Sequence, residues 1–434
     1  MNRSPAGLLE LVALQHQGVA KGFFSVCSAH PSVIEATLRH AARHEAVALI
    51  EATSNQVNPL GGYTGQTPTQ FARLVSNLAA ALGLPPARVI LGGDHLGPYP
   101  FRAEGASLAM EKARQTVHDY VLAGYSKIHL DASMPLLGDP AGPLDPATAT
   151  SRMAELLAVA EAAAAQRTGP PPLYVIGTEV PTPGGETRTD AGPSVTETAA
   201  AEETLALARA ALDERGLSAA AERVIALVVQ PGVEFGDDRI FSYDRGRAAA
   251  LRRFIEGQAG LVFEAHSTDY QPAAALRQMV EDHFAILKVG PGLTFALREA
   301  LYGLEAVERE WLGGRRGVEL CGLHDTLERV MLERPEHWEP YLRTEDPQEA
   351  RSLRHFGWSD RIRYYWPHPD VRAAVRRLNA NLEQRPAPVS LLSQYLPDAA
   401  AALRAGALDN RPSAIVGHRL AAALGVYADA CGLS

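Results

Sequence analysis

Cysteine, long apolar runs and clustered charge of one sign are all scarce in this chain of 434 residues. Its three cysteines, Cys27, Cys321 and Cys431, are far apart and form no CxxC motif, so we expect structural thiols in a reducing compartment. No apolar run approaches the ~20 residues of a membrane-spanning helix, and the N-terminal residues are too mixed in charge for a secretory signal. The sequence therefore predicts a cytoplasmic protein with no membrane contact.

The balance of charge narrows the possible partners. The formal net charge is −9 at pH 7 and is spread without long like-charge runs, which argues against nucleic acid as a partner. No GxxxxGK[ST] loop is present, so a sugar-phosphate kinase is disfavoured.

Eight short apolar segments, each ending in polar residues, dominate what is present. They are GFFSVCSAH from Gly22, VALIEATS from Val47, VILGGDHLG from Val89, KIHLDASM from Lys127, LYVIGTEVP from Leu173, VIALVVQPG from Val224, LVFEAHSTD from Leu261 and AILKVGPGL from Ala285. Alanine-rich amphipathic stretches separate most of them, so strands and helices alternate. This alternation predicts a parallel sheet, and eight units over about 250–300 residues fit a closed (β/α)8 barrel, the TIM-barrel fold.

The strand pattern stops beyond about residue 306. We expect residues 1–305 to form the barrel with an N-terminal capping helix, and residues 306–434 to form a helical C-terminal extension. The extension offers an assembly surface, and we expect a homo-oligomer. The loops at 55–68, 135–146 and 181–194 follow strands and are long or glycine-rich, which is typical of functional lids.

The active site of such a barrel lies at the C-terminal ends of its strands. Ionisable side chains gather at the predicted ends: His30, Glu51, Asp94, His95, His129, Asp131, Glu179, Glu234, Glu264, His266 and Lys288. This inventory is typical of an enzyme.

The motif GGDHLGP places Asp94 beside His95 at the end of the third strand. Such a pair can supply a proton shuttle and a metal ligand, and the flanking glycines let the backbone approach a ligand. The alternative is a structural hydrogen bond in a turn.

The motif KIHLDASM alternates apolar residues with His129, Asp131 and Ser133, which sends the polar set to one face of the strand. Polar groups on a buried strand are costly unless they are paired or used. The alternative to a functional role is a satisfied polar network in the core.

The fifth strand ends at Glu179, and a Pro-Gly-Gly loop then presents Glu186. A carboxylate on such a loop can swing in to relay a proton, or it can be a solvated loop charge.

The motifs QPGVEF and FEAHSTDY add Gln230, Glu264 and His266, of which the last two lie on one side of the seventh strand. With His95 across the barrel they could form a mixed nitrogen and oxygen site for Zn²⁺, Mn²⁺, Co²⁺ or Ni²⁺.

Lys288 ends the eighth strand, directly before glycines and a helix N-terminus. Loops after the seventh and eighth strands of such barrels often bind phosphate through backbone N–H groups. The candidates here are Ser267, Thr268, Gly290 and Gly292, with a simple tight turn as the alternative.

The motif SDRIRYYWPH places Arg361 and Arg363 in the helical tail, where they could reach an anion at the barrel mouth or form a subunit contact. We also expect substrate contacts from Ser28 after the first strand and Asn55 after the second.

Ten motifs together resemble one family. They are FSVCSAHP, IEATSNQVN, GGYTGQTP, LGGDHLGP, KIHLDAS, GTEVPTPGGE, VVQPGVEF, EAHSTDYQ, AILKVGP and SDRIRYYWPH. The chain resembles the accessory, so-called non-catalytic subunits of class II tagatose-bisphosphate aldolases from about Phe23 to Tyr395. Some members of the wider family are ketose 4-epimerases acting on fructose or tagatose, free or 6-phosphorylated.

The barrel is also similar, more remotely, to class II aldolases. That resemblance implies a proton-transferring Asp94, a metal-binding His95, an Asp131-x-Ser133 pair and the carboxylates Glu179 and Glu186. It also implies a reshaped metal site, because Glu264 and His266 stand where the aldolases supply further histidines.

These observations lead to one functional prediction and one alternative. The prediction is a divalent-metal enzyme that cleaves and re-forms the C3–C4 bond of a ketohexose or ketohexose phosphate, as an aldolase component or a 4-epimerase. Its predicted metal ligands are His95 and His266, helped by Glu179 or Glu264, while Asp94, Asp131 and Glu186 move protons and Lys288 holds an oxyanion. The alternative is a subunit that stabilises a separate catalytic aldolase and turns over nothing alone.

Overall fold

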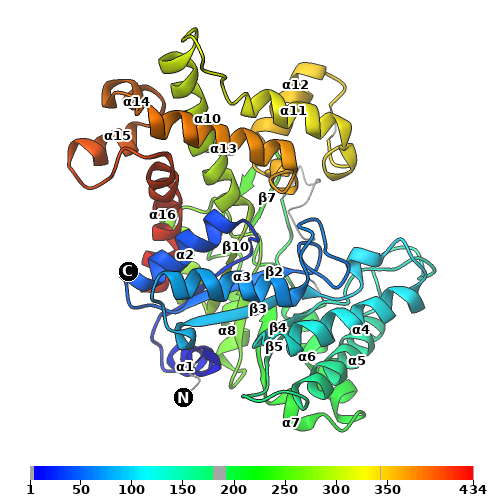
Figure 1. Cartoon of the computed structure of the whole chain (residues 1–434). Helices are drawn as coiled ribbons and strands as arrows, with labels where there is room; N and C mark the ends of the chain where they lie inside the picture. The colour runs from blue at the N-terminus through cyan, green and yellow to red at the C-terminus, as the bar shows by residue number, and fades with distance from the viewer. Residues whose placement is uncertain (1–3, 179–191, 343, 434) are drawn as a thin grey trace.

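The computed structural model describes residues 4–178, 192–342 and 344–433. Its centre is a closed barrel of parallel strands in the order β1-β10-β9-β6-β5-β4-β3-β2 (Figure 1). The strands are β1 Phe23–Val26, β2 Ala48–Thr53, β3 Val89–Leu96, β4 Lys127–Leu130, β5 Leu173–Ile176, β6 Val224–Val228, β9 Val262–Ala265 and β10 Phe284–Val289. Each arises from one of the eight predicted segments, so the prediction of a TIM barrel is confirmed.

Helices follow the strands and cover the outside of the barrel. They are α2 Pro31–Arg43, α3 Pro68–Ala81, α4 Ala106–Leu122, α5 Pro146–Ala164, α6 Thr198–Asp213, α7 Ser218–Ala221, α8 Ala249–Glu256, α9 Ala273–Glu281 and α10 Pro291–Leu312, with short turns η1 Pro86–Arg88 and η2 Tyr99–Phe101. Helix α2 shows why they form: Pro31 occupies its first turn, and Val33, Ile34 and Leu38 lie on one buried face. A short hairpin, β7 Glu234–Phe235 with β8 Ile240–Phe241, follows β6.

Beyond α10 the described chain is helical, as predicted. The elements are α11 Leu323–Glu333, η3 Pro335–His337, α12 Pro347–Phe356, η4 Arg361–Tyr364, α13 Pro369–Gln384, α14 Val389–Tyr395, α15 Pro397–Arg404 and α16 Pro412–Cys431. Helix α10 runs unbroken through residue 305, and α16 returns to pack against α2, α9 and α10. The division at residue 305 therefore falls inside a helix and stays a prediction. Within the described chain, no helix is long and apolar enough to cross a bilayer.

The two ends of the barrel are closed differently. Helix α1 (Ser4–His16) lies across the end where the strands begin, opposite the helices α11 to α13 (Figure 1). Its Leu8, Leu11 and Val12 pack in one buried cluster with residues from the strand starts, such as Leu49 and Ile286. This apolar floor keeps water out of the lower barrel.

Above the floor the inward-facing residues change in character at two-residue steps along each strand. The inward-facing residues of β4 are Lys127 and His129, and Asp131 continues the series just after the strand. On β9 the inward-facing residue is Glu264, and His266 follows it just beyond the strand end. Lys127 Nζ lies 2.5 Å from Glu264 Oε2 across the barrel interior. The barrel thus has an apolar floor, a charged middle layer and an imidazole-bearing mouth.

The floor can be tested on α1. We expect Leu8→Ala, which removes a fully buried side chain, to lower the free energy of unfolding by about 2–5 kcal/mol. The neighbouring Leu9 is 49% exposed, so Leu9→Ala should change the free energy of unfolding by no more than about 0.5 kcal/mol. Urea denaturation followed by circular dichroism measures both values. Equal effects of the two substitutions would show that α1 does not close the barrel.

Candidate metal centre and substrate pocket

Three imidazole rings form a triangle at the mouth of the barrel. The ring centroids of His95 and His266 are 4.7 Å apart, and each lies 5.0 Å from that of His129. Asp94 completes the group, because one ligand atom from each of the four residues lies within 4.8 Å of the others. All four side chains are buried.

Carboxylates fix the orientation of two of these rings. His95 Nδ1 lies 2.7 Å from Asp131 Oδ2, and His266 Nε2 lies 3.1 Å from Glu264 Oε1. Both carboxyl groups have pKa values below their usual range and therefore accept the hydrogen bonds. The second nitrogen of His266, whose ring is neutral at pH 7, is thereby left unprotonated. A carboxylate behind a histidine is the usual outer shell of a metal site.

His129 provides the observation that tests whether a metal fits. Its Nδ1 lies 3.1 Å from Asp94 Oδ1 and 3.2 Å from the backbone nitrogen of His95, and its fully buried Nε2 has no hydrogen-bond partner in the described part of the chain. When Nδ1 donates to Asp94, the lone pair of Nε2 is available to a cation. An unpaired buried nitrogen is costly unless something binds it. Three imidazoles and a carboxylate suit Zn²⁺, Mn²⁺, Co²⁺ or Ni²⁺, so these residues fit a divalent cation.

Asp94 and His95 reach the same site although they are adjacent on β3. His95 has a φ of +46°, and the pairing of β3 with β4 shifts register between Gly93 and Leu96. This kink turns both side chains toward the mouth. Gly97 permits it, because a Cβ there would lie 1.6 Å from the carbonyl oxygen of Asp131.

Below the imidazoles lies a network of buried ions. Lys127 Nζ is 2.6 Å from Glu51 Oε1, and Lys288 Nζ is 2.5 Å from both Glu51 Oε2 and Asp94 Oδ1. Lys288 also lies 3.5 Å from Glu264. The ammonium of Lys288 thus occupies the centre of the acidic group that Glu51 forms with Asp94.

The network sets the charge of the ligand residues. Burial alone would raise the pKa of Asp94, but His95 and Lys288 outweigh it and hold that pKa well below its usual value. Burial lowers the pKa of His266 to about 3, so its ring is neutral at pH 7. Burial would also lower the pKa of His95, but the neighbouring Asp94 and Asp131 outweigh it and raise that pKa. The surroundings of His95 therefore favour a positively charged group.

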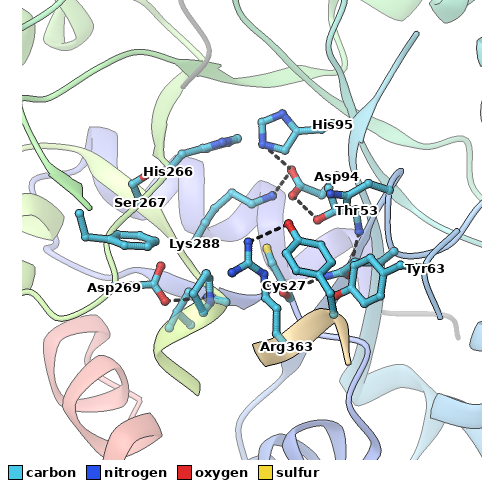
Figure 2. A pocket seen from close by; sticks show the side chains of 17 residues that line it. Cys27, Thr53, Tyr63, Asp94, His95, His266, Ser267, Asp269, Lys288 and Arg363 are labelled. Carbon is cyan, nitrogen blue, oxygen red and sulfur yellow. Dashed lines mark hydrogen bonds and ion pairs between the residues drawn. The ribbon is translucent and has the colours of Figure 1, made fainter. Parts of the chain in front are cut away.

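A pocket opens directly above the metal-site group (Figure 2). Asp94, His95 and His266 form one part of its wall, and Lys288 and Cys27 lie between them and Arg363. Burial raises the pKa of the Cys27 thiol well above its usual value, so Cys27 is present as the neutral thiol.

The C-terminal extension supplies the opposite wall. Arg363 and Tyr364, both on η4, line the pocket together with Tyr63 from the loop after β2. Arg363 Nη2 donates to the Tyr364 hydroxyl at 2.9 Å. Burial would raise the pKa of Tyr364, but Arg363 and Arg361 outweigh it and lower the pKa.

The loops after β9 and β10 differ from the expected phosphate site. The backbone N–H groups of Gly290 and Gly292 donate to Asp269 Oδ1 at 2.9 and 2.7 Å. The Thr268 hydroxyl donates to the Lys288 carbonyl at 2.7 Å, which makes it a structural bond. Three of the four expected phosphate donors, Thr268, Gly290 and Gly292, are therefore satisfied within the chain, and Ser267 lines the pocket.

The predicted site residues divide into three groups by position. Those lining the pocket are Asn55, Asp94, His95, His266, Ser267, Lys288, Gly290 and Arg363. Glu179 and Glu186 lie outside the described residues. The others lie behind or beside the pocket: Asp131, Glu264, Ser28, Gln230, Thr268 and Arg361.

Local contacts explain why the last group lies off the pocket. Gln230 Oε1 accepts the N–H groups of the turn that follows it, and Ser28 Oγ accepts the N–H of His30. The Arg361 guanidinium stacks 3.7 Å from the ring centre of Tyr341. Glu264 is held by Lys127 and His266, beneath the four-residue group rather than in it.

The sequence places His129 in the polar set of its strand without a ligand role, and it assigns no role to Asp269, Tyr63 or Tyr364. The two-residue alternation that identifies Asp131 also applies to His129, and it could have indicated the third imidazole. Asp269, Tyr63 and Tyr364 lie in predicted motifs but enter the pocket through long-range packing, for which the sequence holds no local signal.

Comparison with known proteins places this geometry in a family. The model of the D-tagatose-1,6-bisphosphate aldolase subunit GatZ/KbaZ-like family matches residues 8–432, so the chain belongs to that family and the resemblance predicted from its motifs is confirmed. The chain is 49% identical to a D-tagatose 6-phosphate 4-epimerase of Agrobacterium fabrum over 399 residues, which cover 92% of this chain and 93% of that protein.

A solved structure from Sinorhizobium meliloti 1021, described as a probable tagatose 6 phosphate kinase, is also similar. It is 45% identical, has a TM-score of 0.85, and the match covers 95% of this chain and 100% of that chain.

The prediction that these residues bind a metal can be tested at His129. We expect His129→Gln to weaken binding of Mn²⁺ or Zn²⁺ by more than the roughly 10–100-fold that loss of a supporting residue costs, because it removes a ligand nitrogen. Calorimetric titration of the metal-free protein measures the affinity. His118→Gln, at a half-buried surface histidine that contacts Asp119, is the matched control. Equal affinity in the two variants would contradict the assignment.

Proposed function

We propose that this member of the GatZ/KbaZ-like family inverts C4 of a ketohexose 6-phosphate, interconverting the tagatose and fructose forms, by cleaving and re-forming the C3–C4 bond. The observation that carries this proposal is the convergence of Asp94, His95, His129 and His266 within 4.8 Å at the mouth of the barrel, beneath a pocket. The epimerase name of the Agrobacterium fabrum relative supports the choice of reaction.

The chemistry follows from the substrate's own bonds. The C4 hydroxyl loses a proton, the electrons of the C3–C4 bond move toward the C2 carbonyl, and the sugar separates into an enediolate and glyceraldehyde 3-phosphate. The aldehyde turns its other face to C3, the bond re-forms, and the C4 alkoxide takes a proton back. A divalent cation held by the three histidines and Asp94 would supply polarisation of the C2 carbonyl oxygen.

The chain's residues divide the remaining work. Asp131 orients His95, and Lys288 keeps Asp94 ionised, so both act through their neighbours rather than as proton carriers. Tyr364 lines the pocket, and the lowering of its pKa by Arg363 and Arg361 suits a hydroxyl that exchanges a proton with the substrate. Glu186 stays the predicted partner in that exchange.

Charge on the C-terminal side supports a phosphorylated substrate. Arg363 lines the pocket, and with Tyr63 it also lines a neighbouring groove between α2, α13 and α16. That groove carries five further arginines in a chain whose net charge is −9: Arg39, Arg43, Arg372, Arg376 and Arg411. A basic approach to a pocket raises the local concentration of an anionic substrate.

Two other functions are less well supported by the site. The family description names an aldolase subunit, and a subunit that only stabilises an aldolase is the first alternative. A purely structural barrel, however, has no need of a buried, unpaired imidazole nitrogen beside a pocket. The kinase description of the Sinorhizobium meliloti protein is not carried over, because this sequence lacks a GxxxxGK[ST] loop.

Activity of the isolated protein tests the proposal directly. With Mn²⁺, Zn²⁺ or Ni²⁺ added, tagatose 6-phosphate should convert to fructose 6-phosphate, and a chelator should abolish the conversion. In D₂O the product should carry no deuterium at C3 or C4, because no C–H bond breaks. Nuclear magnetic resonance measures both results.

The outcomes separate the alternatives. Deuterium at C4 would refute carbon–carbon cleavage. No turnover by the isolated protein, combined with stabilisation of a separate class II aldolase in a mixing experiment, would establish the subunit role instead.

The phosphate contact can be tested at Arg363. We expect Arg363→Met to raise KM for the ketohexose 6-phosphate roughly 10–150-fold. This corresponds to the loss of about 1.5–3 kcal/mol of binding free energy from one charge-assisted contact. KM for the free ketose should change little. Arg361→Met, two residues away and stacked on Tyr341, is the control and should leave the ratio of the two KM values unchanged. A parallel change for both sugars in Arg363→Met would contradict a phosphate contact.

A further inference from the structure

The N-terminus of α10 is filled by a side chain of the protein itself. Asp269, in the loop after β9, places Oδ1 within hydrogen-bond distance of the N–H groups of both Gly290 and Gly292. Its side chain is 3% exposed, and it lines the pocket beside Ser267 (Figure 2). The capping position of α10, Gly290, has no side chain that could do this.

This position has a defined chemistry in a (β/α)8 barrel. The N–H groups after the seventh and eighth strands, at the start of a helix, commonly hold a substrate phosphate. Here a carboxylate accepts from those N–H groups. Burial raises the pKa of Asp269 to about 6, so the group is still mostly negative at pH 7.

The rest of the pocket offers one positively charged phosphate contact. Among the described residues that line it, the cationic side chains other than histidine are Arg363 and Lys288. Lys288 is committed to Glu51 and Asp94 at 2.5 Å. A second phosphate of the substrate would find the N–H groups of Gly290 and Gly292 already bonded to the Asp269 carboxylate.

We propose that Asp269 is a specificity-determining residue, which closes the anion site at the start of α10 and so restricts the pocket to ketoses with a single phosphate. This inference rests on the proposed function and deepens it. One phosphate would meet Arg363, and the Asp269 carboxylate, which lines the same pocket, can accept a hydrogen bond from a hydroxyl group of the sugar. A 1,6-bisphosphate, the aldolase substrate in the family's name, is rejected by like-charge repulsion.

Binding measurements test the proposal without requiring turnover. For the wild-type protein, calorimetry should show a Kd for fructose 1,6-bisphosphate at least about tenfold weaker than for fructose 6-phosphate, because of the charge repulsion. Asp269→Gly, which frees both N–H groups, should strengthen binding of the bisphosphate and of inorganic phosphate by at least about tenfold.

Two further variants keep the test decisive. Asp269→Asn retains the shape and an acceptor oxygen but not the charge, so it should also strengthen bisphosphate binding. If Asp269→Gly does not fold, the affinity of Asp269→Asn for the bisphosphate tests the proposal by itself. Asp145→Asn is the matched control, because the Asp145 side chain likewise accepts an N–H at a helix start, from Thr148 at 2.9 Å on α5, and lies off the pocket. Asp145→Asn should leave the affinities for the bisphosphate and for inorganic phosphate unchanged.

The contradicting results are distinct from failure of the epimerase proposal. Equal binding of bisphosphate and monophosphate by the wild-type protein would overturn the role of Asp269, and so would folded Asp269 variants that gain no affinity. Absence of epimerase activity with the predicted binding pattern would instead refute the reaction and leave the closure of the anion site intact.

Discussion

The ion network in the middle of the barrel is the constraint on which the site depends. Four buried carboxylates, of Glu51, Asp94, Asp131 and Glu264, face two buried ammonium groups, of Lys127 and Lys288. With the three neighbouring histidines neutral, the buried group carries two negative charges in excess, and protonation of His95, which its raised pKa favours, reduces the excess to one. Burying uncompensated charge is costly, and a divalent cation at the mouth is the charge that would neutralise it. The residues that support the proposed metal and those that fill the core are thus the same network.

The alternation of the β-strand explains how one short segment serves packing and chemistry together. On β4, Lys127 joins the ion network, His129 enters the imidazole triangle, and Asp131 orients His95 from just beyond the strand. These roles lie two residues apart because inward-facing side chains recur with that period. A shift of register by one residue would turn all three outward, so the apolar floor beneath them, which fixes the register, also fixes the site.

The sequence predicts the barrel well because its signals are local. Each strand is a short apolar run, and each run has its own polar end. The site is only partly predictable, because its geometry depends on contacts between residues that are far apart in the sequence. The GGDHLGP motif predicts Asp94 and His95 at the site, but not the left-handed φ of +46° at His95 that lets both side chains reach the mouth. Glu264 was predicted as a ligand, but Lys127 lies opposite it across the barrel and pairs with it, a neighbour that only the closed structure reveals. The entry of Tyr364 into the pocket likewise depends on how the C-terminal extension folds back.

The pocket draws its chemistry and its selectivity from different parts of the chain. The metal-site group lies on β3, β4 and the end of β9, whereas Arg363 comes from η4, more than seventy residues beyond the last barrel strand. Asp269 belongs to the loop between β9 and α9 and is fixed by backbone N–H groups rather than by the ion network. The end groups that the pocket accepts can therefore change at η4 or at residue 269 without disturbing the histidines. In the proposed mechanism, carbon–carbon cleavage is common to an epimerase and an aldolase, so the residues that hold the end groups of the sugar, rather than the histidines, are where such enzymes would differ within one fold.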